Sequence, residues 1–295
     1  KLPSLNVDIL NGHVFGITKF ILFRPVSRIN DNEILINTLM QELKYLAPRT
    51  AKVFVEYNDH KYKFLFQERI VKEFLEFNNL VEGPIYKGDE RFAFNEIKYG
   101  YKKPKNSESF ESYIELGISK HKLSNGKWAV ASKENLNLAS AGLEILNVSN
   151  HFYKSNYGQF RVIDYFTSQK NSTFDKFYTA LPEYDALIFS LAAEHSLSRD
   201  DRRFYFDIHK NKFLPILYDG KAKIFKNINN ELDPLFIDIL KVWKTERLSL
   251  KVHGVISSAI TGSKKALEQL NAIDENNLHK ILEKRGLIID INFLK

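Results

Sequence analysis

The chain has no cysteine among its 295 residues. This absence excludes disulfide bonds, thiolate metal ligands and cysteine nucleophiles. The sequence also lacks any apolar run near the roughly 18 residues that a membrane span needs. Its first residues, KLPSLNVDIL, do not contain the long apolar core of a signal peptide. We therefore expect no membrane-spanning segment, although these absences leave the cellular compartment open.

Several motifs that carry nucleotide or hydrolase chemistry are also missing. The chain contains no G-x-x-x-x-G-K-[ST], G-x-G-x-x-G or G-x-S-x-G sequence, so P-loop, dinucleotide-binding and hydrolase-elbow sites lack their residues. Its eight histidines show no H-x-x-x-H pair with a carboxylate partner, which argues against zinc chemistry. Repeats and low-complexity segments are absent as well.

The charge balance is mildly basic. Forty-three Lys and Arg against thirty-six Asp and Glu give a net charge of +7, which favours anionic partners such as nucleotides or polyphosphates. The basic residues are scattered and do not form a stripe with interleaved aromatics, so we expect no nucleic-acid partner. With 44% hydrophobic residues, the composition is that of a folded domain whose function lies in a local site.

Apolar periodicity predicts an α+β fold. We expect a β-like run over His13 to Phe23, a helix from Asn32 to Leu46 and a hairpin from Lys52 to Glu68. A short helix over 70–77 and a brief strand in GPIYKGDE should follow. After the polar stretch 101–112, a helix entered at Pro182 should run toward His195, and Asp233-Pro234 should open another helix.

The stretch RDDRRFYFDIHKNKFLPILYDG, residues 199–220, predicts a second hairpin whose two strands are bracketed by carboxylates. With its apex at Lys210, Asp201 and Asp219 fall opposite each other. Opposed side chains in an antiparallel pair lie roughly 4.5–5.5 Å apart at Cβ. Two carboxylates that close need a cation, a proton or arginines to neutralise them.

These segments together resemble the spore-coat protein H (CotH) kinase family. The resemblance rests on LAPRTAKVFVEYNDHKYKFLFQERIVKEFL, then GPIYKGDE, then RRFYFD with FLPILYDG, within about Val14 to Lys223. It implies a two-lobed protein-kinase-like fold with a small sheet-rich N-lobe, residues 1–105, and a mainly helical C-lobe, residues 106–295, that carries the hairpin. It also implies ATP and a divalent metal, taken as Mg²⁺, as cofactors, with a protein hydroxyl as phosphate acceptor.

Roles carry over by position. Glu68 matches the family's glutamate after the first hairpin, Lys87 matches the lysine of its Tyr-Lys-Gly turn, and Asp219 matches a metal-binding aspartate. Asp201 falls near a second metal-binding position. Leu217 stands where the family has a further aspartate, GKAKIF replaces an expected phenylalanine-glycine, and Asn58-Asp59-His60 replaces a turn that usually contains glycine.

Phosphoryl transfer requires positioning and charge neutralisation. Asp201 and Asp219 would supply the carboxylates for Mg²⁺, and Lys87, or alternatively Lys63, would hold the phosphates with Glu68 orienting the lysine. Asp200 is the candidate base, with a surface salt bridge as its alternative. His195 is a catalytic candidate that could instead brace the loop.

Each assignment has a plainer alternative. The DDRR sequence can pair its own acids with its own arginines, and Glu68 and Lys87 can form an ordinary exposed ion pair. Because of the departures from the family pattern, an inactive pseudokinase that serves as a scaffold in a larger cell-envelope protein remains a second hypothesis. A third is a binder of phosphate-rich ligands or acidic glycans through Arg24, Arg28 and the lysine-rich stretch 101–112, with pairing of the arginines to Asp31 or Glu33 as the structural alternative.

Overall fold

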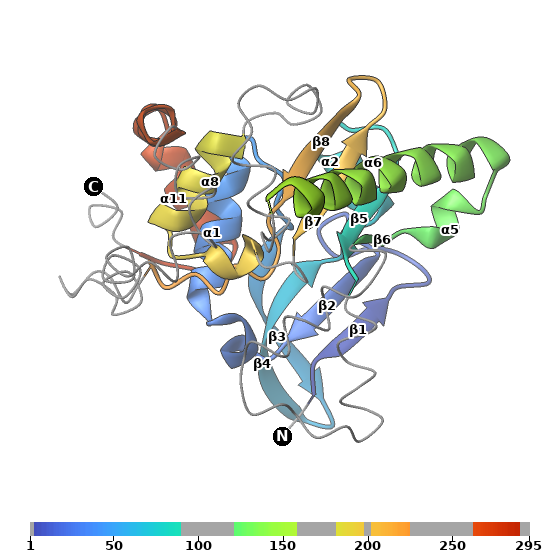
Figure 1. The fold of residues 1–295 in the computed structure, drawn as a ribbon. Coiled ribbons are helices and arrows are strands. Elements are labelled where there is room, and N and C mark those ends of the chain that lie inside the picture. Colours follow the sequence, from blue (N-terminus) through green and yellow to red (C-terminus); the bar gives the residue numbers. More distant parts are fainter. Residues whose placement is uncertain (1–2, 90–120, 158–180, 198–201, 225–261, 290–295) are drawn as a thin grey trace, which may run out of the picture.

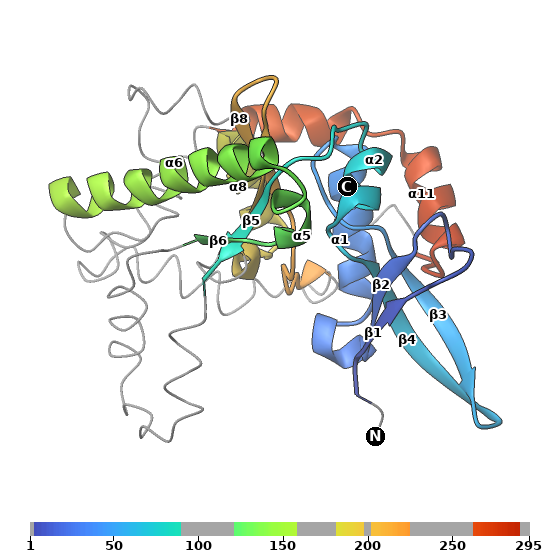
Figure 2. The same ribbon diagram turned by 90° about the vertical axis from the view of Figure 1, so that its right-hand side faces the viewer.

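The computed structural model describes residues 3–89, 121–157, 181–197, 202–224 and 262–289. It is an α+β structure, as the sequence predicts, and the described residues form two four-stranded antiparallel sheets. Its first sheet has the order β1-β2-β4-β3 and its second the order β6-β5-β7-β8. Helices α1, α8 and α11 lie side by side at one flank, and α6 lies along the second sheet (Figures 1 and 2).

The first sheet is built from local hairpins. Its strands are β1 (Leu5–Asp8), β2 (Lys19–Phe23), β3 (Thr50–Tyr57) and β4 (His60–Glu68). The turn between β3 and β4 has Asn58 and Asp59 at φ 49° and 60°, the left-handed conformation of a two-residue hairpin turn that asparagine and aspartate tolerate. The predicted hairpin over Lys52 to Glu68 is therefore confirmed without a glycine in its turn.

The strand predicted over His13 to Phe23 is shorter than expected. Only Lys19–Phe23 forms β2, because Phe15 and Gly16 take positive φ values and turn the chain at a bridge between Val14 and Ile17. Strand β1, which the sequence pattern did not indicate, pairs with β2 at the sheet edge.

The second sheet unites segments from distant parts of the chain. Strand β5 (Ile85–Gly88) pairs with β6 (His121–Leu123) and with β7 (Arg203–Asp207), which forms a hairpin with β8 (Lys212–Ile216). The predicted boundary between lobes, at residues 105 and 106, lies outside the described residues. Strand β5, which precedes that boundary, joins strands that follow it.

Helix α1 (Asp31–Glu42) is the centre of the main core. Every residue from Asn32 to Met40 is buried. Its apolar side chains pack with Leu65 of the first sheet, Leu187 of α8 (Leu181–Ser190) and Leu282 of α11 (Glu275–Lys284). Each fully buried leucine or isoleucine of this core contributes about 1.5–3 kcal/mol, so α1 fixes the first sheet against both other helices.

The remaining elements are short, apart from α6. The 3-10 helix η1 (Pro25–Arg28) precedes α1, and α2 (Lys72–Phe77) follows β4 as predicted. Helix α5 (Gly126–Ala129) leads into α6 (Lys133–Tyr157), and η3 (Glu194–Leu197) follows α8. The helix predicted to run to His195 thus ends at Ser190 and resumes as a 3-10 turn. The helix predicted at Asp233-Pro234 lies outside the described residues.

Within the described part of the chain, no helix combines the length and the apolar character needed to cross a membrane.

Gly142 offers a test of the packing between α6 and β5. A Cβ at this position would overlap the hydroxyl and ring of Tyr86, whose hydroxyl donates a hydrogen bond to the Ala139 carbonyl at 2.8 Å. We predict that Gly142→Ala lowers the free energy of unfolding by about 1–3 kcal/mol, although alanine is the better helix former. Denaturant unfolding monitored by circular dichroism measures the change.

Gly126→Ala is the matched control, because a Cβ at this α5 glycine meets nothing within 4 Å. It should leave stability unchanged or slightly raised. Equal stability losses in the two variants would contradict the predicted clash with Tyr86.

Candidate functional site: the Asp219 cluster

Asp219 lies just beyond the second strand of the β7–β8 hairpin. Strand β8 ends at Ile216, and Leu217 continues by donating its backbone N–H to the Leu46 carbonyl at 2.8 Å. Asp219 then takes a left-handed conformation with φ 49°, which is uncommon for a residue other than glycine and often occurs at functional sites. The turn directs its carboxylate toward η1 and η3.

Arg28, the last residue of η1, is the main partner of Asp219. Its Nη1 forms an ion pair with Asp219 Oδ2, and its Nη2 donates to the Tyr218 hydroxyl at 3.0 Å. The guanidinium also lies 4.2 Å from the ring centroid of Phe23 and 4.9 Å from that of Tyr218. Arg28 is thus held by two aromatic rings and a carboxylate, a semi-enclosed setting in which charge interactions exceed those at the surface.

His195 approaches the same carboxylate oxygen from η3. Its Nε2 lies 4.0 Å from Asp219 Oδ2, and about a third of its side chain is exposed. That separation is too long for a hydrogen bond, yet it places an imidazole and a guanidinium at one oxygen of Asp219. The structure therefore brings together two predicted site residues, His195 and Asp219.

The other carboxylate oxygen of Asp219, Oδ1, is buried and accepts no hydrogen bond within the described residues. A buried carboxylate oxygen without a donor is costly unless water or a cation reaches it. Because hard oxygen atoms are the ligands of Mg²⁺, Oδ1 fits the role of a single magnesium ligand. Within the described residues, no group of three or more His, Asp and Glu side chains forms a complete metal site.

Arg203 adds a second cation beside Tyr218. It is the first residue of β7, and its guanidinium lies 3.4 Å from the Tyr218 ring centroid. Tyr218 therefore contacts two guanidiniums, those of Arg28 and Arg203. Guanidinium groups of this kind donate charge-assisted hydrogen bonds to phosphate oxygens.

Glu33 is a buried acid close to this cluster. Both Gln67 Nε2 and Asn37 Nδ2 donate to its Oε1, at 2.9 and 3.3 Å. Burial raises the pKa of Glu33, and attraction to Arg28, the two amide hydrogen bonds and His195 only partly offset this effect. The sequence suggested Glu33 only as a pairing partner of Arg24 or Arg28, and its burial depends on tertiary packing that no local pattern shows.

Of the two carboxylates predicted to face each other across the hairpin, Asp201 and Asp219, only Asp219 lies in the described residues. Asp200 and Asp201 lie outside the described residues, so their predicted roles stay predictions. The predicted register, with an apex at Lys210, is wrong by one residue. Arg203 pairs with Ile216 and Asp207 with Lys212, because Asp207 Oδ1 accepts the Lys210 N–H at 3.2 Å in a four-residue turn that ends at left-handed Asn211.

Glu68 has a different partner from the predicted one. Arg49 Nε and Nη2 donate to its two carboxylate oxygens at 2.9 and 2.6 Å, and the Arg49 backbone N–H adds a bond at 3.2 Å. Lys87 lies on β5 in the other sheet, opposite Arg203 and Lys122. The cation that Glu68 holds is therefore Arg49.

Lys63, the alternative phosphate lysine, is exposed on β4. It is five residues from Glu68 on the same strand, so the two side chains point to opposite faces of the sheet. Glu68 cannot orient Lys63 in this geometry.

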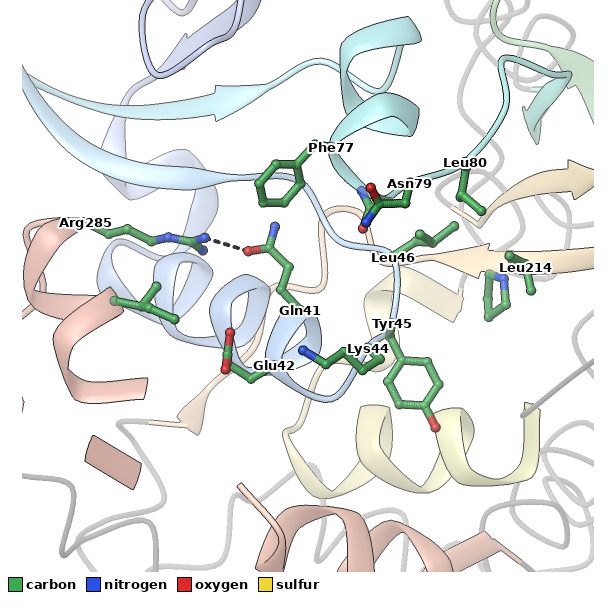
Figure 3. Close-up of a pocket in the computed structure, with 13 residues that line it drawn as sticks. Gln41, Glu42, Lys44, Tyr45, Leu46, Phe77, Asn79, Leu80, Leu214 and Arg285 are labelled. Carbon is green, nitrogen blue, oxygen red and sulfur yellow. Dashed lines mark hydrogen bonds between the residues drawn. The ribbon is translucent and has the colours of Figure 1, made fainter. Parts of the chain in front are cut away.

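A cavity of about 630 Å³ opens near the carboxyl end of α1, whereas Arg28 of the Asp219 cluster precedes its amino end. Figure 3 shows Gln41 there, accepting a hydrogen bond from Arg285 at 2.6 Å, with Phe77, Tyr45 and Lys44 around the space. None of the predicted site residues lines this cavity. The cavity is therefore separate from the Asp219 cluster.

The raised pKa of Glu33 predicts a pH dependence of stability. The folded chain binds this proton more tightly than the unfolded chain, whose carboxyl has the ordinary pKa of 4.5. The Glu33 contribution is thus complete below that value and is lost as the pH rises through the raised pKa. We predict that, as the pH rises above 4.5, Glu33→Gln loses less stability than the wild type, measured by urea unfolding.

Glu73 provides a control of opposite sign. Burial raises its pKa, but hydrogen bonds from Thr18 and from its own backbone N–H, together with attraction to Lys19 and Lys72, outweigh that effect and leave it lowered. Glu73→Gln should change the stability profile at acid pH only. A Glu33→Gln profile parallel to that of the wild type would contradict the raised pKa of Glu33.

Comparisons with protein-family models and with curated proteins found no match for this chain.

Proposed function

We propose that this protein is a kinase-like phosphotransferase that binds ATP with Mg²⁺ at the Asp219 cluster and transfers the terminal phosphate to a hydroxyl, on a protein acceptor. One observation carries the proposal. Asp219 sits in a left-handed turn after the β7–β8 hairpin, and among the described residues its buried Oδ1 accepts no hydrogen bond while Oδ2 pairs with Arg28. A hard cation such as Mg²⁺ would satisfy this oxygen.

The residues around Asp219 suit the charge of a phosphate chain. Asp219 Oδ1 would be one magnesium ligand, with Asp201 as the second ligand that the sequence predicts. Arg28 and Arg203 flank Tyr218 and would donate charge-assisted hydrogen bonds to phosphate oxygens. Lys87 remains the proposed lysine for the inner phosphates. The proposal also includes a two-lobed arrangement, with α1 between the first sheet and the second sheet.

The reaction itself needs no covalent intermediate. The acceptor hydroxyl oxygen attacks the terminal phosphorus, the bond between that phosphorus and ADP breaks, and the hydroxyl proton passes to a base, for which Asp200 is the candidate. His195, 4.0 Å from Asp219, would hold the carboxylate in place or accept this proton. Catalysis of this type depends mainly on positioning and electrostatic stabilisation.

A second candidate function is nucleotide binding without transfer, in a pseudokinase that serves as a scaffold of the cell envelope. Three observations favour it. Arg28 already pairs with Asp219, and Arg49 already pairs with Glu68. Leu217, at the position of the family's other aspartate, is fully buried in the main core and supplies no carboxylate for a metal ion.

Calorimetric titration with ATP tests the proposal, with and without Mg²⁺. We predict that the wild type binds ATP in a magnesium-dependent manner and that Asp219→Asn weakens this binding at least about tenfold, because the amide loses the charge that magnesium requires. Asp59→Asn, an exposed substitution in the β3–β4 turn, is the matched control and should bind like the wild type.

Absence of ATP binding by the folded wild type would overturn both candidate functions. Transfer of labelled phosphate from ATP to a protein hydroxyl, lost in Asp219→Asn, supports the phosphotransferase. Binding that is independent of magnesium and gives no transfer supports the scaffold.

A further inference from the structure

A second cavity, of about 430 Å³, lies between the β1–β2 loop, the start of β3 and the carboxyl end of α11. Its walls are mostly apolar and consist of Phe15, Ile17, Ala51, Phe66 and Ile281. The volume is within the range of about 300–1,000 Å³ that small-molecule sites occupy. None of the residues proposed to bind ATP lines it.

All charged residues that line this cavity are cations. They are Arg49, Lys284 and Arg285, and no carboxylate is among the lining residues. Two of them are held in place, because Arg49 is bound by Glu68 and donates to the Phe15 carbonyl at 3.0 Å, while Arg285 donates to α1. The apolar walls therefore end at a fixed cationic rim.

Lys284 differs from the two arginines. It is the last residue of α11 and is exposed, and within the described residues its ammonium forms no ion pair. A lysine at this position is able to swing onto a ligand without breaking an existing contact. The rim thus offers one mobile cation beside two fixed ones.

Arg285 is a buried cation at this rim. Burial lowers its pKa to about 10, repulsion from Arg49 lowers it further, and attraction to Glu42 and Glu68 only partly offsets these effects. An anion beside Arg285 would offset the cost of burying its charge. The electrostatics of the rim therefore favour a negatively charged ligand.

Phe15 forms the mouth of the cavity in an unusual backbone conformation. Its φ is 54°, its ring packs edge-on against Phe66 with centroids 5.8 Å apart, and 62% of its surface is exposed. Backbone strain of this kind concentrates at ligand clamps. An apolar ligand would cover the exposed ring.

We propose that this cavity binds a small amphiphilic anion, with an aliphatic or aromatic body against Phe15, Ile17 and Phe66 and one carboxylate or phosphate at the Lys284–Arg285 rim. The charge complementarity and the apolar walls point to the same ligand class. A free acid and the headgroup of a membrane lipid share this chemistry. The site is independent of the proposed ATP site, so either proposal can fail alone.

Calorimetry with octanoate and octyl phosphate, below their aggregation concentrations, tests the site. Both should bind at one site per chain, whereas octylamine, which has the same body with the opposite charge, and acetate, which lacks the body, should not. Flotation with vesicles that contain phosphatidic acid separates the two sources. Octanoate binding without flotation indicates a free ligand, and binding with flotation indicates a lipid headgroup. Equal binding of octylamine and octanoate would overturn the proposal.

Two charge reversals on α11 form a matched pair. Lys284→Glu should weaken octanoate binding at least about tenfold, because it removes the mobile cation and adds a repelling charge. Lys280→Glu lies one turn earlier on the same helix, is exposed, and lines neither described cavity, so it should bind octanoate like the wild type. Equal losses in both variants would show general electrostatic attraction and would refute the site.

Ala51→Phe gives an independent readout, because it fills the cavity from β3. It should abolish octanoate binding while magnesium-dependent ATP binding persists. Retained octanoate binding in a folded Ala51→Phe protein would place the ligand elsewhere and refute the assignment.

Discussion

The burial of α1 on every side is the constraint on which the rest of the structure depends. Residues Asn32 to Met40 have no exposed face, so the apolar ones form the main core and the polar ones need partners inside the protein. Asn37 is satisfied in part by Thr50, at 2.9 Å, and Glu33 by Gln67. Buried polar residues of α1 therefore require Thr50 and Gln67 of the first sheet to point inward as hydrogen-bond partners. The helix also buries the carboxyl group of Glu33, which water would solvate at the surface.

This central helix also explains how the two regions of interest are arranged. At its amino end lies η1, whose Arg28 joins Phe23, Tyr218 and Asp219 into one cluster. Along its side lies α11, whose Arg285 donates to Thr38 and Gln41 and forms the rim shared by the two cavities. Arginines that can attract anions therefore lie at two places on this buried helix. Arg28 precedes its amino end, and Arg285 lies beside Thr38 and Gln41 nearer its carboxyl end.

Local patterns predicted most of the secondary structure around the site. The hairpin over Lys52 to Glu68, helix α1 and the β7–β8 hairpin follow from alternation and turn residues, which act over a few positions. Two predictions were wrong, the register of the β7–β8 hairpin and the length of β2, because each depends on individual side-chain bonds or backbone conformations. An Asp207 side chain bonded to the Lys210 N–H shifts the hairpin register by one residue, and left-handed Phe15 and Gly16 shorten a strand that apolar content alone had extended.

The sequence by itself determined the α+β class, the two hairpins and the position of Asp219 at a strand end, because these depend on residues that are near neighbours in the chain. Only the tertiary structure decided which cation meets which acid. Glu68 holds Arg49 and Asp219 holds Arg28, pairings across 19 and 191 residues that no local pattern encodes. Ion pairs depend on the distance and burial of side chains, and these are fixed only when the sheets and helices have packed around α1.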